Sequence, residues 1–213
     1  MVERRPVVLR AESALAGISL PVELSRSGLI ACERSPQLAT VMAYNGRRAD
    51  VATRLKQRYD LMLPDGPWRA MSGASAVIGL GPRTWLFERV SGPALEPDLS
   101  EVLSDAAAVT DQSDAYVVIR LKGPRVRDVF AKGISIDFHD RVFVPGCVAA
   151  TSCAHIGIIL WRLEDTSGSA RFDIAVFRSL ARSLWHFIEE SAAEFAMAVA
   201  AGRARTPDCD DSR

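Results

Sequence analysis

The chain has 213 residues, of which 48% are hydrophobic and 24% are charged. A chain of this size and composition can bury a full hydrophobic core, which excludes a disordered polypeptide, a collagen-like repeat and a small disulfide scaffold. Its 26 Lys and Arg side chains balance its 26 Asp and Glu side chains, so the formal charge is zero. A general nucleic-acid-binding protein would need an excess of positive charge.

Targeting signals and cysteines give the expected location. No stretch approaches the roughly 20 apolar residues of a membrane span. The apolar segment 14–24 is interrupted by Gly17, Pro21 and Glu23, unlike the core of a signal peptide. The cysteines are widely spaced and form no Cys-x-x-Cys pair; they are Cys32, Cys147, Cys153 and Cys209. We therefore expect reduced cysteines in a cytoplasmic protein that binds neither membranes nor nucleic acids.

The first part of the chain predicts an arm followed by one α+β half. Residues 1–35 mix small apolar residues with Ser, Gly and Arg in no regular pattern, which is typical of an N-terminal arm. The first half should extend over 36–106. Its periodicity predicts a strand at 38–44, a helix at 48–60, a hairpin of strands at 75–80 and 84–88, and a short helix at 96–105.

A second half over 107–202 repeats this order. A short echo accompanies the repeat: Arg-Arg-Ala-Asp-Val at 47–51 corresponds to Arg-Val-Arg-Asp-Val at 125–129. Chance and an ancient duplication both explain so short an echo. The predicted elements are a strand at 115–121, a helix opening at Gly123-Pro124 and closing at Gly133, strands at 148–153, 155–163 and 171–177, a helix at 179–201 and a polar tail at 203–213.

Two patterns predict which faces are buried. In the strand at 171–177, Phe172, Ile174 and Val176 alternate with Arg171 and Asp173, so one face should form core and the other should be wetter. The helix at 179–201 has a broad apolar stripe, which usually faces a sheet. The sequence therefore predicts an α+β fold of two similar strand–helix–hairpin–helix halves, with mostly antiparallel sheet and helices packed on it.

The few histidines and cysteines give weak signals for catalysis. His139, His155 and His186 form no metal-binding spacing. Cys153 and His155 are two apart on a predicted strand and so share a face, but a zinc site needs about four ligands. A dyad of Cys147 or Cys153 with one of the histidines is an alternative to cysteines that pack as small hydrophobic residues.

Three further motifs bear on binding or proton transfer. Asp-Phe-His-Asp at 137–140 is either a proton-transfer site or, more simply, an exposed turn. Gly-Leu-Gly-Pro at 79–82 lacks the third glycine of a dinucleotide-binding loop. Gly-Pro-Arg at 123–125 precedes a helix and has basic neighbours at Arg120, Lys122 and Arg127, so it could bind a phosphate or carboxylate. A solvated basic helix start explains it equally simply.

Charge is also distributed in blocks. Residues 96–119 contain six acids and no Lys or Arg, whereas residues 120–132 contain five bases and one acid. Such blocks either orient a docking surface or are two unrelated solvated faces. The residues alone assign no catalytic, cofactor-binding or metal-binding position.

Four stretches resemble the gamma subunit family of heterotetrameric sarcosine oxidase. They are AVTDQSDAYVVIRL at 108–121 with GPR at 123–125, IDFH at 136–139 with FVPG at 143–146, AHIGIILWR at 154–162, and FDIAV at 172–176 with SLWH at 183–186. Their order and spacing also fit. The resemblance is close over 105–197, looser over 36–104, and does not extend before about residue 35.

The resemblance implies a non-catalytic subunit that supports flavin-containing alpha and beta subunits. The complex would demethylate sarcosine oxidatively to glycine, with tetrahydrofolate as one-carbon acceptor. FAD, FMN, NAD and folate would belong to the larger subunits and zinc to a delta subunit, so this chain would hold none of them. Whether the chain is itself an enzyme stays uncertain at this stage.

The resemblance also implies a fold similar to the folate-binding domains of the glycine-cleavage T-protein. No catalytic residue of the T-protein can be placed on this sequence. Trp161 and Trp185 are expected in the core, and Asp111 and Gln112 in a turn or subunit contact. The alternative function is a self-standing folate-binding protein of the T-protein type.

Overall fold

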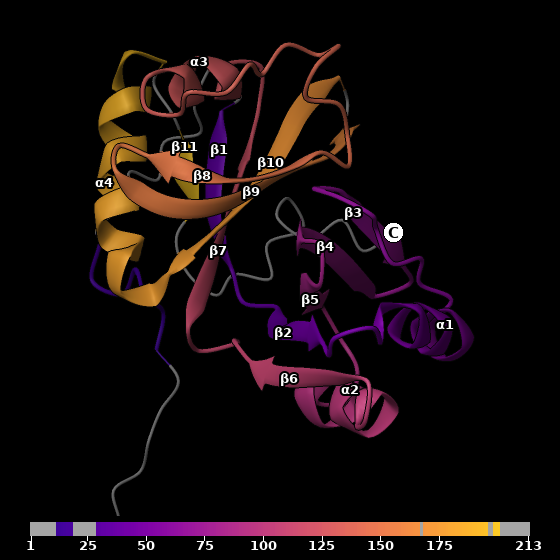
Figure 1. Cartoon of the computed structure of the whole chain (residues 1–213). Coiled ribbons are helices and arrows are strands. Elements are labelled where there is room, and N and C mark those ends of the chain that lie inside the picture. The colour runs from indigo at the N-terminus through magenta and orange to yellow at the C-terminus, as the bar shows by residue number, and fades with distance from the viewer. Residues whose placement is uncertain (1–11, 19–28, 167, 196–197, 201–213) are drawn as a thin grey trace, which may run out of the picture.

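The computed structural model describes residues 12–18, 29–166, 168–195 and 198–200. Their strands form two sheets that face each other, and helices cover the two outer faces (Figure 1). The layer order is therefore helix, sheet, sheet, helix. The predicted α+β class with mostly antiparallel sheets is confirmed. Within the described ranges, no helix is long and apolar enough to cross a membrane.

The smaller sheet has five strands in the order β3-β4-β5-β2-β6, and each neighbouring pair is antiparallel. Its outer face packs against two helices, with Val51 and Leu55 from α1 and Leu99 from α2 contacting the cluster that contains Val41 and Trp85. The elements are β2 (Gln37–Ala43), α1 (Arg48–Tyr59), β3 (Arg69–Ser72), β4 (Ser75–Gly81), β5 (Thr84–Arg89), α2 (Leu95–Leu103) and β6 (Ala107–Asp111).

The larger sheet has the order β11-β1-β7-β10-β9-β8, in which only the outermost pair, β11 and β1, is parallel among the described strands. Phe130 of α3 and Leu184 and Ile188 of α4 pack with Phe172 and Ile174 on its outer face. The elements are β1 (Ile30–Arg34), β7 (Tyr116–Lys122), α3 (Val126–Ala131), β8 (Val148–Cys153), β9 (Ile156–Thr166), β10 (Ser169–Phe177), η1 (Arg178–Leu180), α4 (Ala181–Ala192), η2 (Ala193–Phe195) and β11 (Ala198–Ala200).

The two halves repeat the same topology. The strand order β3-β4-β5-β2 in one sheet corresponds to β8-β9-β10-β7 in the other, and each half places its two helices at the same points in the chain. The residues before α1 and α3 have almost the same backbone angles, φ −97° and ψ 8° at Arg47 and φ −102° and ψ 6° at Arg125. Each arginine pairs with the aspartate three residues on, Asp50 or Asp128. The sequence echo therefore occupies equivalent positions, which favours duplication over chance.

The predicted division of the chain differs from the sheets at two places. Residues 30–34 form β1, which pairs with β7 inside the larger sheet, and Leu29 and Ala31 are fully buried. The prediction of an irregular arm is therefore wrong for these residues, while 1–11 and 19–28 lie outside the described residues. Residues 107–111, assigned to the second half with no predicted strand, form β6, which closes the smaller sheet beside β2. The predicted tail at 203–213 also lies outside the described residues.

The long C-terminal helix predicted over 179–201 is shorter. Helix α4 ends at Ala192, and the backbone of Ala198–Ala200 pairs with the edge of β1 as β11. An apolar run of small residues fits a helix or a strand equally well, and here the backbone donors and acceptors at the sheet edge favour the strand. Leu180, expected on the buried stripe, is 38% exposed.

Gly133 follows α3 but does not act as the predicted left-handed helix cap. Its φ is not positive, and the residue that caps α3, Lys132, has right-handed helical angles. A Cβ atom at position 133 would lie 2.4 Å from Cζ of Phe187 on α4. The glycine is therefore needed for close packing of the α3 end against α4 rather than for its backbone freedom.

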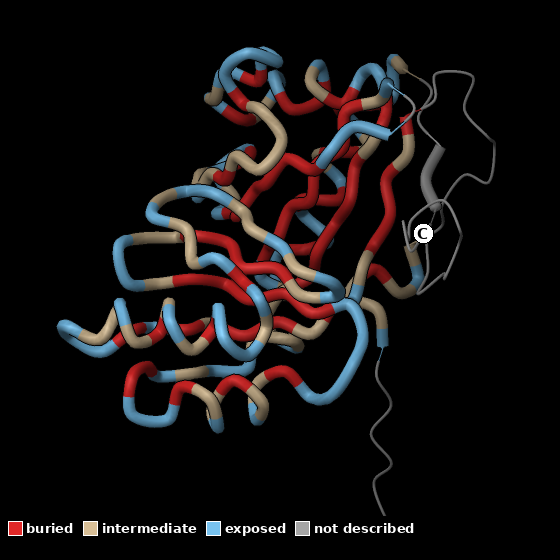
Figure 2. Tube along the Cα trace, turned by 90° about the vertical axis from the view of Figure 1, so that its right-hand side faces the viewer, coloured by how far each residue is buried: buried red, intermediate tan, exposed pale blue. Residues whose placement is uncertain are grey.

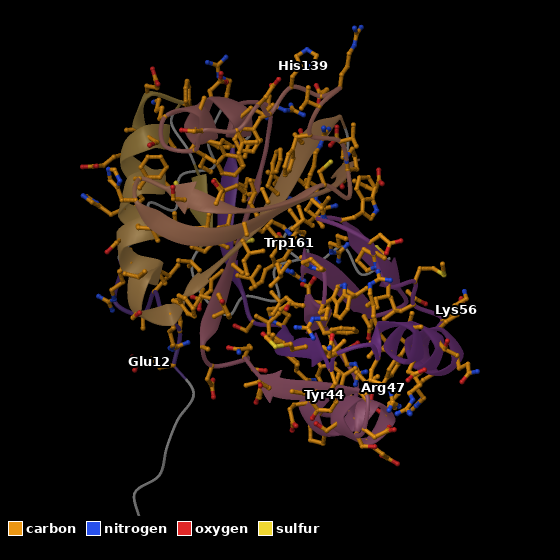
Figure 3. All side chains as sticks on the ribbon, in the orientation of Figure 1. Glu12, Tyr44, Arg47, Lys56, His139 and Trp161 are labelled. Atoms are coloured by element: carbon orange, nitrogen blue, oxygen red, sulfur yellow. The ribbon has the colours of Figure 1, made fainter. Side chains whose placement is uncertain are left out.

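The inner face of β10 also differs from the prediction. Asp173 and Ala175 face the smaller sheet rather than water, and both have a relative accessibility of 0%. An apolar cluster joins the sheets and contains Leu38 and Ile78 from the smaller one and Trp161 from the larger one. Figure 2 shows that the strands are buried over most of their length, and Figure 3 places Trp161 between the two sheets. Both faces of the larger sheet are thus core.

Candidate functional site

A cluster of charged side chains lies between the two sheets, beside the apolar cluster that contains Leu38, Ile78 and Trp161. Arg120 on β7 holds Asp173 on β10 with two hydrogen bonds, Nε to Oδ1 at 2.7 Å and Nη2 to Oδ2 at 2.9 Å. Nη1 of Arg34 on β1 donates to Asp173 Oδ2 at 2.9 Å and to Oε1 of Glu88 on β5 at 2.5 Å. Nη2 of Arg69 on β3 lies 3.3 Å from Glu88 Oε2. The cluster therefore connects five strands and both sheets.

Burial makes the pairing within this cluster obligatory. Asp173 and Glu88 have relative accessibilities of 0% and 1%, and an unpaired buried carboxylate would be strongly unfavourable. Burial by itself would raise the pKa of Asp173, but the positive charges of Arg120 and Arg34 outweigh it and lower the pKa to about 2. Asp173 is therefore ionised throughout the physiological pH range.

A cleft of about 560 Å³ opens next to the charged cluster. This volume lies within the range of roughly 300–1,000 Å³ that is typical of small-molecule sites. The charged residues along its wall are Arg34, Arg69, Arg120, Arg162, Arg171 and Glu164. The apolar side chains at its wall include Trp68, Met71 and Val90, which are 44%, 63% and 46% exposed.

Two of these arginines each have one unsatisfied donor in the described structure. The Nε atoms of Arg69 and Arg162 are buried and have no hydrogen-bond acceptor among the described residues. The outer nitrogens of Arg162 are engaged: Nη1 donates to the Phe143 carbonyl at 2.7 Å and Nη2 to Asp165 Oδ1 at 3.0 Å. A buried N–H without an acceptor is unfavourable, so each of these two guanidiniums has one donor that the described part of the protein leaves unsatisfied.

The rim of the cleft is fixed by contacts between the two sheets. Backbone N–H groups of Arg69 and Val148 donate to Gly146 at 2.8 Å and to Pro67 at 3.0 Å. Gly146 has a φ of +94°, and a Cβ atom there would lie 2.5 Å from Cζ2 of Trp68. Only glycine permits this close approach. The half-exposed indole of Trp68 is thus held in place at the mouth.

The predicted Cys153–His155 pair is not formed, and the expectation that the two share a strand face is wrong. Cys153 ends β8 and is buried, which raises the pKa of its thiol to about 12. His155 is exposed in the two-residue turn between β8 and β9, where Ala154 and His155 have φ values of +45° and +70°. A buried thiol with so high a pKa is unreactive. Cys153 therefore packs as a core residue.

The other cysteines and histidines are also dispersed. Cys147 and Cys153 are free thiols, but Cys32 is disulfide-bonded, so the prediction of reduced cysteines is wrong for Cys32. Cys209 lies outside the described residues. No hydrogen bond between described residues joins a cysteine to a histidine, and no group of three His, Cys, Asp or Glu side chains in the same ranges could hold a metal ion.

Asp137, His139 and Asp140 are exposed, as the simpler interpretation predicted, while Phe138 between them is buried in the core. The backbone N–H of His139 donates to Asp137 Oδ1 at 2.8 Å, and Asp140 pairs with Arg127. Figure 3 shows His139 at the outer edge of the molecule. This arrangement places no partner for proton transfer beside the imidazole within the described structure.

The basic residues around 123–125 do not converge on the helix start. Arg120 points between the sheets, Arg125 pairs with Asp128, and Arg127 donates to the Phe138 carbonyl. Helix α3 has only six residues. The anion site considered at this position is therefore not formed.

Two acids of the acidic block, Asp98 and Asp105, pair with arginines at α1 rather than with the basic block. Asp98 pairs with Arg58, and Asp105 accepts from Arg54 at 2.6 Å and from Arg47 at 2.8 Å. The hydrogen bonds from Arg54 and Arg47 lower the pKa of Asp105 to about 2. Apart from Arg120, which is buried between the sheets, the blocks do not form one docking surface and make local ion pairs.

Two structural expectations from the resemblance are confirmed. Trp161 and Trp185 have relative accessibilities of 0% and 1%. Asp111 accepts from the backbone N–H of Ser113 at 2.9 Å and so forms a turn, and the backbone of Gln112 bonds to Leu38 and Tyr116. The cleft itself was missed because its arginines are scattered from residue 34 to residue 171. A signal was available in the arginines within apolar strands, Arg120 in VVIRL and Arg162 in ILWRL.

Comparison of the fold with solved structures defines its class first. Glycine cleavage system aminomethyltransferase T from Bartonella henselae superposes with a TM-score of 0.59 and 15% identity, over 83% of this chain and 48% of that one. The paired sheets with outer helices are therefore an aminomethyltransferase T-like fold. A chain of the heterotetrameric sarcosine oxidase from Corynebacterium sp. U-96 superposes more closely, with a TM-score of 0.75 and 25% identity over 88% of this chain and 97% of that one.

The chain belongs to the sarcosine oxidase gamma subunit family, whose sequence model matches residues 45–194. It is 30% identical over 128 residues to the sarcosine oxidase subunit gamma of Corynebacterium sp. (strain U-96), and the match spans 60% of each chain. It is 33% identical over 94 residues to the corresponding subunit of Arthrobacter sp., over 44% of this chain and 46% of that one. The sequence match thus covers less than two thirds of these relatives.

Proposed function

We propose that this chain is the non-catalytic gamma subunit of a heterotetrameric sarcosine oxidase. Its partners would be the flavin-containing alpha and beta subunits and a small delta subunit. The observation that carries the proposal is the superposition on 97% of a chain of such an enzyme. Family membership over residues 45–194 supports it independently.

In this proposal the complex demethylates sarcosine oxidatively to glycine and passes the one-carbon unit to tetrahydrofolate. FAD, FMN, NAD and folate are held by the larger subunits and zinc by the delta subunit. Cys153 and His155 support a non-catalytic role for the chain. The Cys153 thiol has a pKa of about 12, which makes it a poor nucleophile, and His155 is exposed in a turn. The contribution of the chain is then shape and contact surface.

Co-expression with the alpha subunit tests the proposal. The two chains should migrate together on size exclusion, and mass spectrometry of that fraction should find both. Separate migration of two folded chains would exclude a stable gamma–alpha contact and would overturn the proposal.

The alternative, a self-standing folate-binding protein, differs in what the isolated chain does. The T-like fold favours it. Calorimetry of the isolated chain with tetrahydrofolate separates the two functions, because only the alternative requires binding without partner subunits. No heat at millimolar ligand would exclude the alternative.

A further inference from the structure

The cleft between the sheets concentrates hydrogen-bond donors. Five strands each contribute one arginine to it, Arg34 from β1, Arg69 from β3, Arg120 from β7, Arg162 from β9 and Arg171 from β10. Each guanidinium has five N–H donors and no acceptor. Glu164 is the one acidic residue among the described residues of the wall.

The remaining carboxylates lie behind or outside this wall. Glu88 and Asp173 are at most 1% accessible, and Asp140 and Asp165 hold Arg162 from the solvent side at 3.0 Å each. These acids neutralise the arginines but leave the Nε donors of Arg69 and Arg162 without acceptors in the described structure. The local charge is therefore balanced while hydrogen-bond donors remain in excess, which suits an anion that binds through its oxygen atoms.

The mouth of the cleft offers a flat apolar surface next to these donors. The indole of Trp68 is fixed there by Gly146, and Met71 and Val90 line the same cleft. We propose that the cleft is a binding site for a small organic acid that carries two acidic groups, carboxylate or phosphate, on a flat apolar frame. The acidic oxygens accept from guanidinium N–H groups of the arginines that line the cleft, and the frame packs against Trp68. This goes beyond the proposed supporting function and does not depend on the partner subunits.

Titration of the full-length chain with isophthalate tests the proposal, with the uncharged isophthalamide as matched control. Trp85, Trp161 and Trp185 are at most 1% accessible, whereas Trp68 is 44% exposed, so a saturable change in tryptophan fluorescence reports on the cleft. We expect saturable fluorescence and calorimetric signals with isophthalate at millimolar concentration and none with isophthalamide. Equal binding of both compounds, or binding of neither, would overturn the proposal.

Variants locate the site. Arg69→Met should weaken isophthalate binding about tenfold, because it removes a charge-assisted hydrogen bond. Arg83→Met, in the exposed turn between β4 and β5, is the matched control and should bind normally. Because Arg69 also pairs with Glu88, the thermal midpoint of the Arg69→Met variant is recorded to check that it is folded. Trp68→Ala provides a second test that leaves the charges of the cleft intact. Calorimetry should show that Trp68→Ala weakens the binding of isophthalate more than the binding of inorganic phosphate. Normal isophthalate binding by both Arg69→Met and Trp68→Ala would refute the site.

The ligand chemistry has two sources that parallel titrations distinguish. A folate carries two carboxylates on its glutamate tail, and a free dicarboxylic acid or organic phosphate offers the same groups. Tighter binding of tetrahydrofolate than of isophthalate and phosphate assigns the site to a folate. The reverse order assigns it to a free acid.

Discussion

Removal of the Asp173 carboxylate should destabilise the protein strongly. Asp173 is fully buried and pairs with Arg120 and Arg34, which are themselves largely buried. The substitution Asp173→Ala leaves both arginines with less compensating charge in the core. Breaking a buried ion pair from one side costs about 3–5 kcal/mol, against a total stability of about 5–15 kcal/mol for a typical protein.

Urea denaturation at neutral pH, followed by tryptophan fluorescence, measures this loss. The control is Asp105→Ala, because Asp105 also has two arginine partners and a pKa lowered to about 2, but its side chain is 61% exposed. Solvent screens exposed pairs, so the control should lose far less stability. Equal losses for the two variants would refute the argument that burial, rather than pairing alone, makes Asp173 critical.

Three further predictions concern acid stability, helix packing and a strained turn. The folded-state pKa of Asp173, about 2, lies below the ordinary value of 3.8 for an aspartate, so the stabilisation by Asp173 is fully present above about pH 4 and should be lost as the pH falls toward 2. Acid titration by circular dichroism should show that Asp173→Asn removes this pH dependence, and an unchanged profile would contradict the assignment. Gly133→Ala should cost about 1–3 kcal/mol in urea denaturation, because the new Cβ atom overlaps Phe187, and Phe187→Leu should recover part of the loss. Wild-type stability of Gly133→Ala would contradict the close packing. His155→Gly should stabilise the β8–β9 turn by about 0.5–1 kcal/mol, because glycine adopts a positive φ without steric cost; a lower melting midpoint would show that the turn is not strained.

Local sequence patterns predicted the elements that depend on local interactions. The helix at 48–59 has Val51 and Leu55 on one face, and the β4–β5 hairpin has turn residues between two apolar runs. These signals lie within about ten residues of one another. They were sufficient for the α+β class and for the repeat of the two halves.

Elements that depend on distant partners could not be recognised in this way. Strand β1 is a short run whose burial comes from pairing with β7, about ninety residues away in sequence. The inner face of β10 carries Arg171 and Asp173 and therefore looked wet, although the second sheet covers it. The cleft has the same origin, because its arginines meet only when the two sheets pack together.

The central claim is that this chain supports chemistry carried out by its partner subunits. Sarcosine-dependent peroxide production tests it most directly, measured on the purified chain alone and on the chain assembled with alpha, beta and delta subunits. The account predicts no turnover by the isolated, flavin-free chain and turnover by the assembly that contains it. Turnover of sarcosine by the isolated chain would contradict the account.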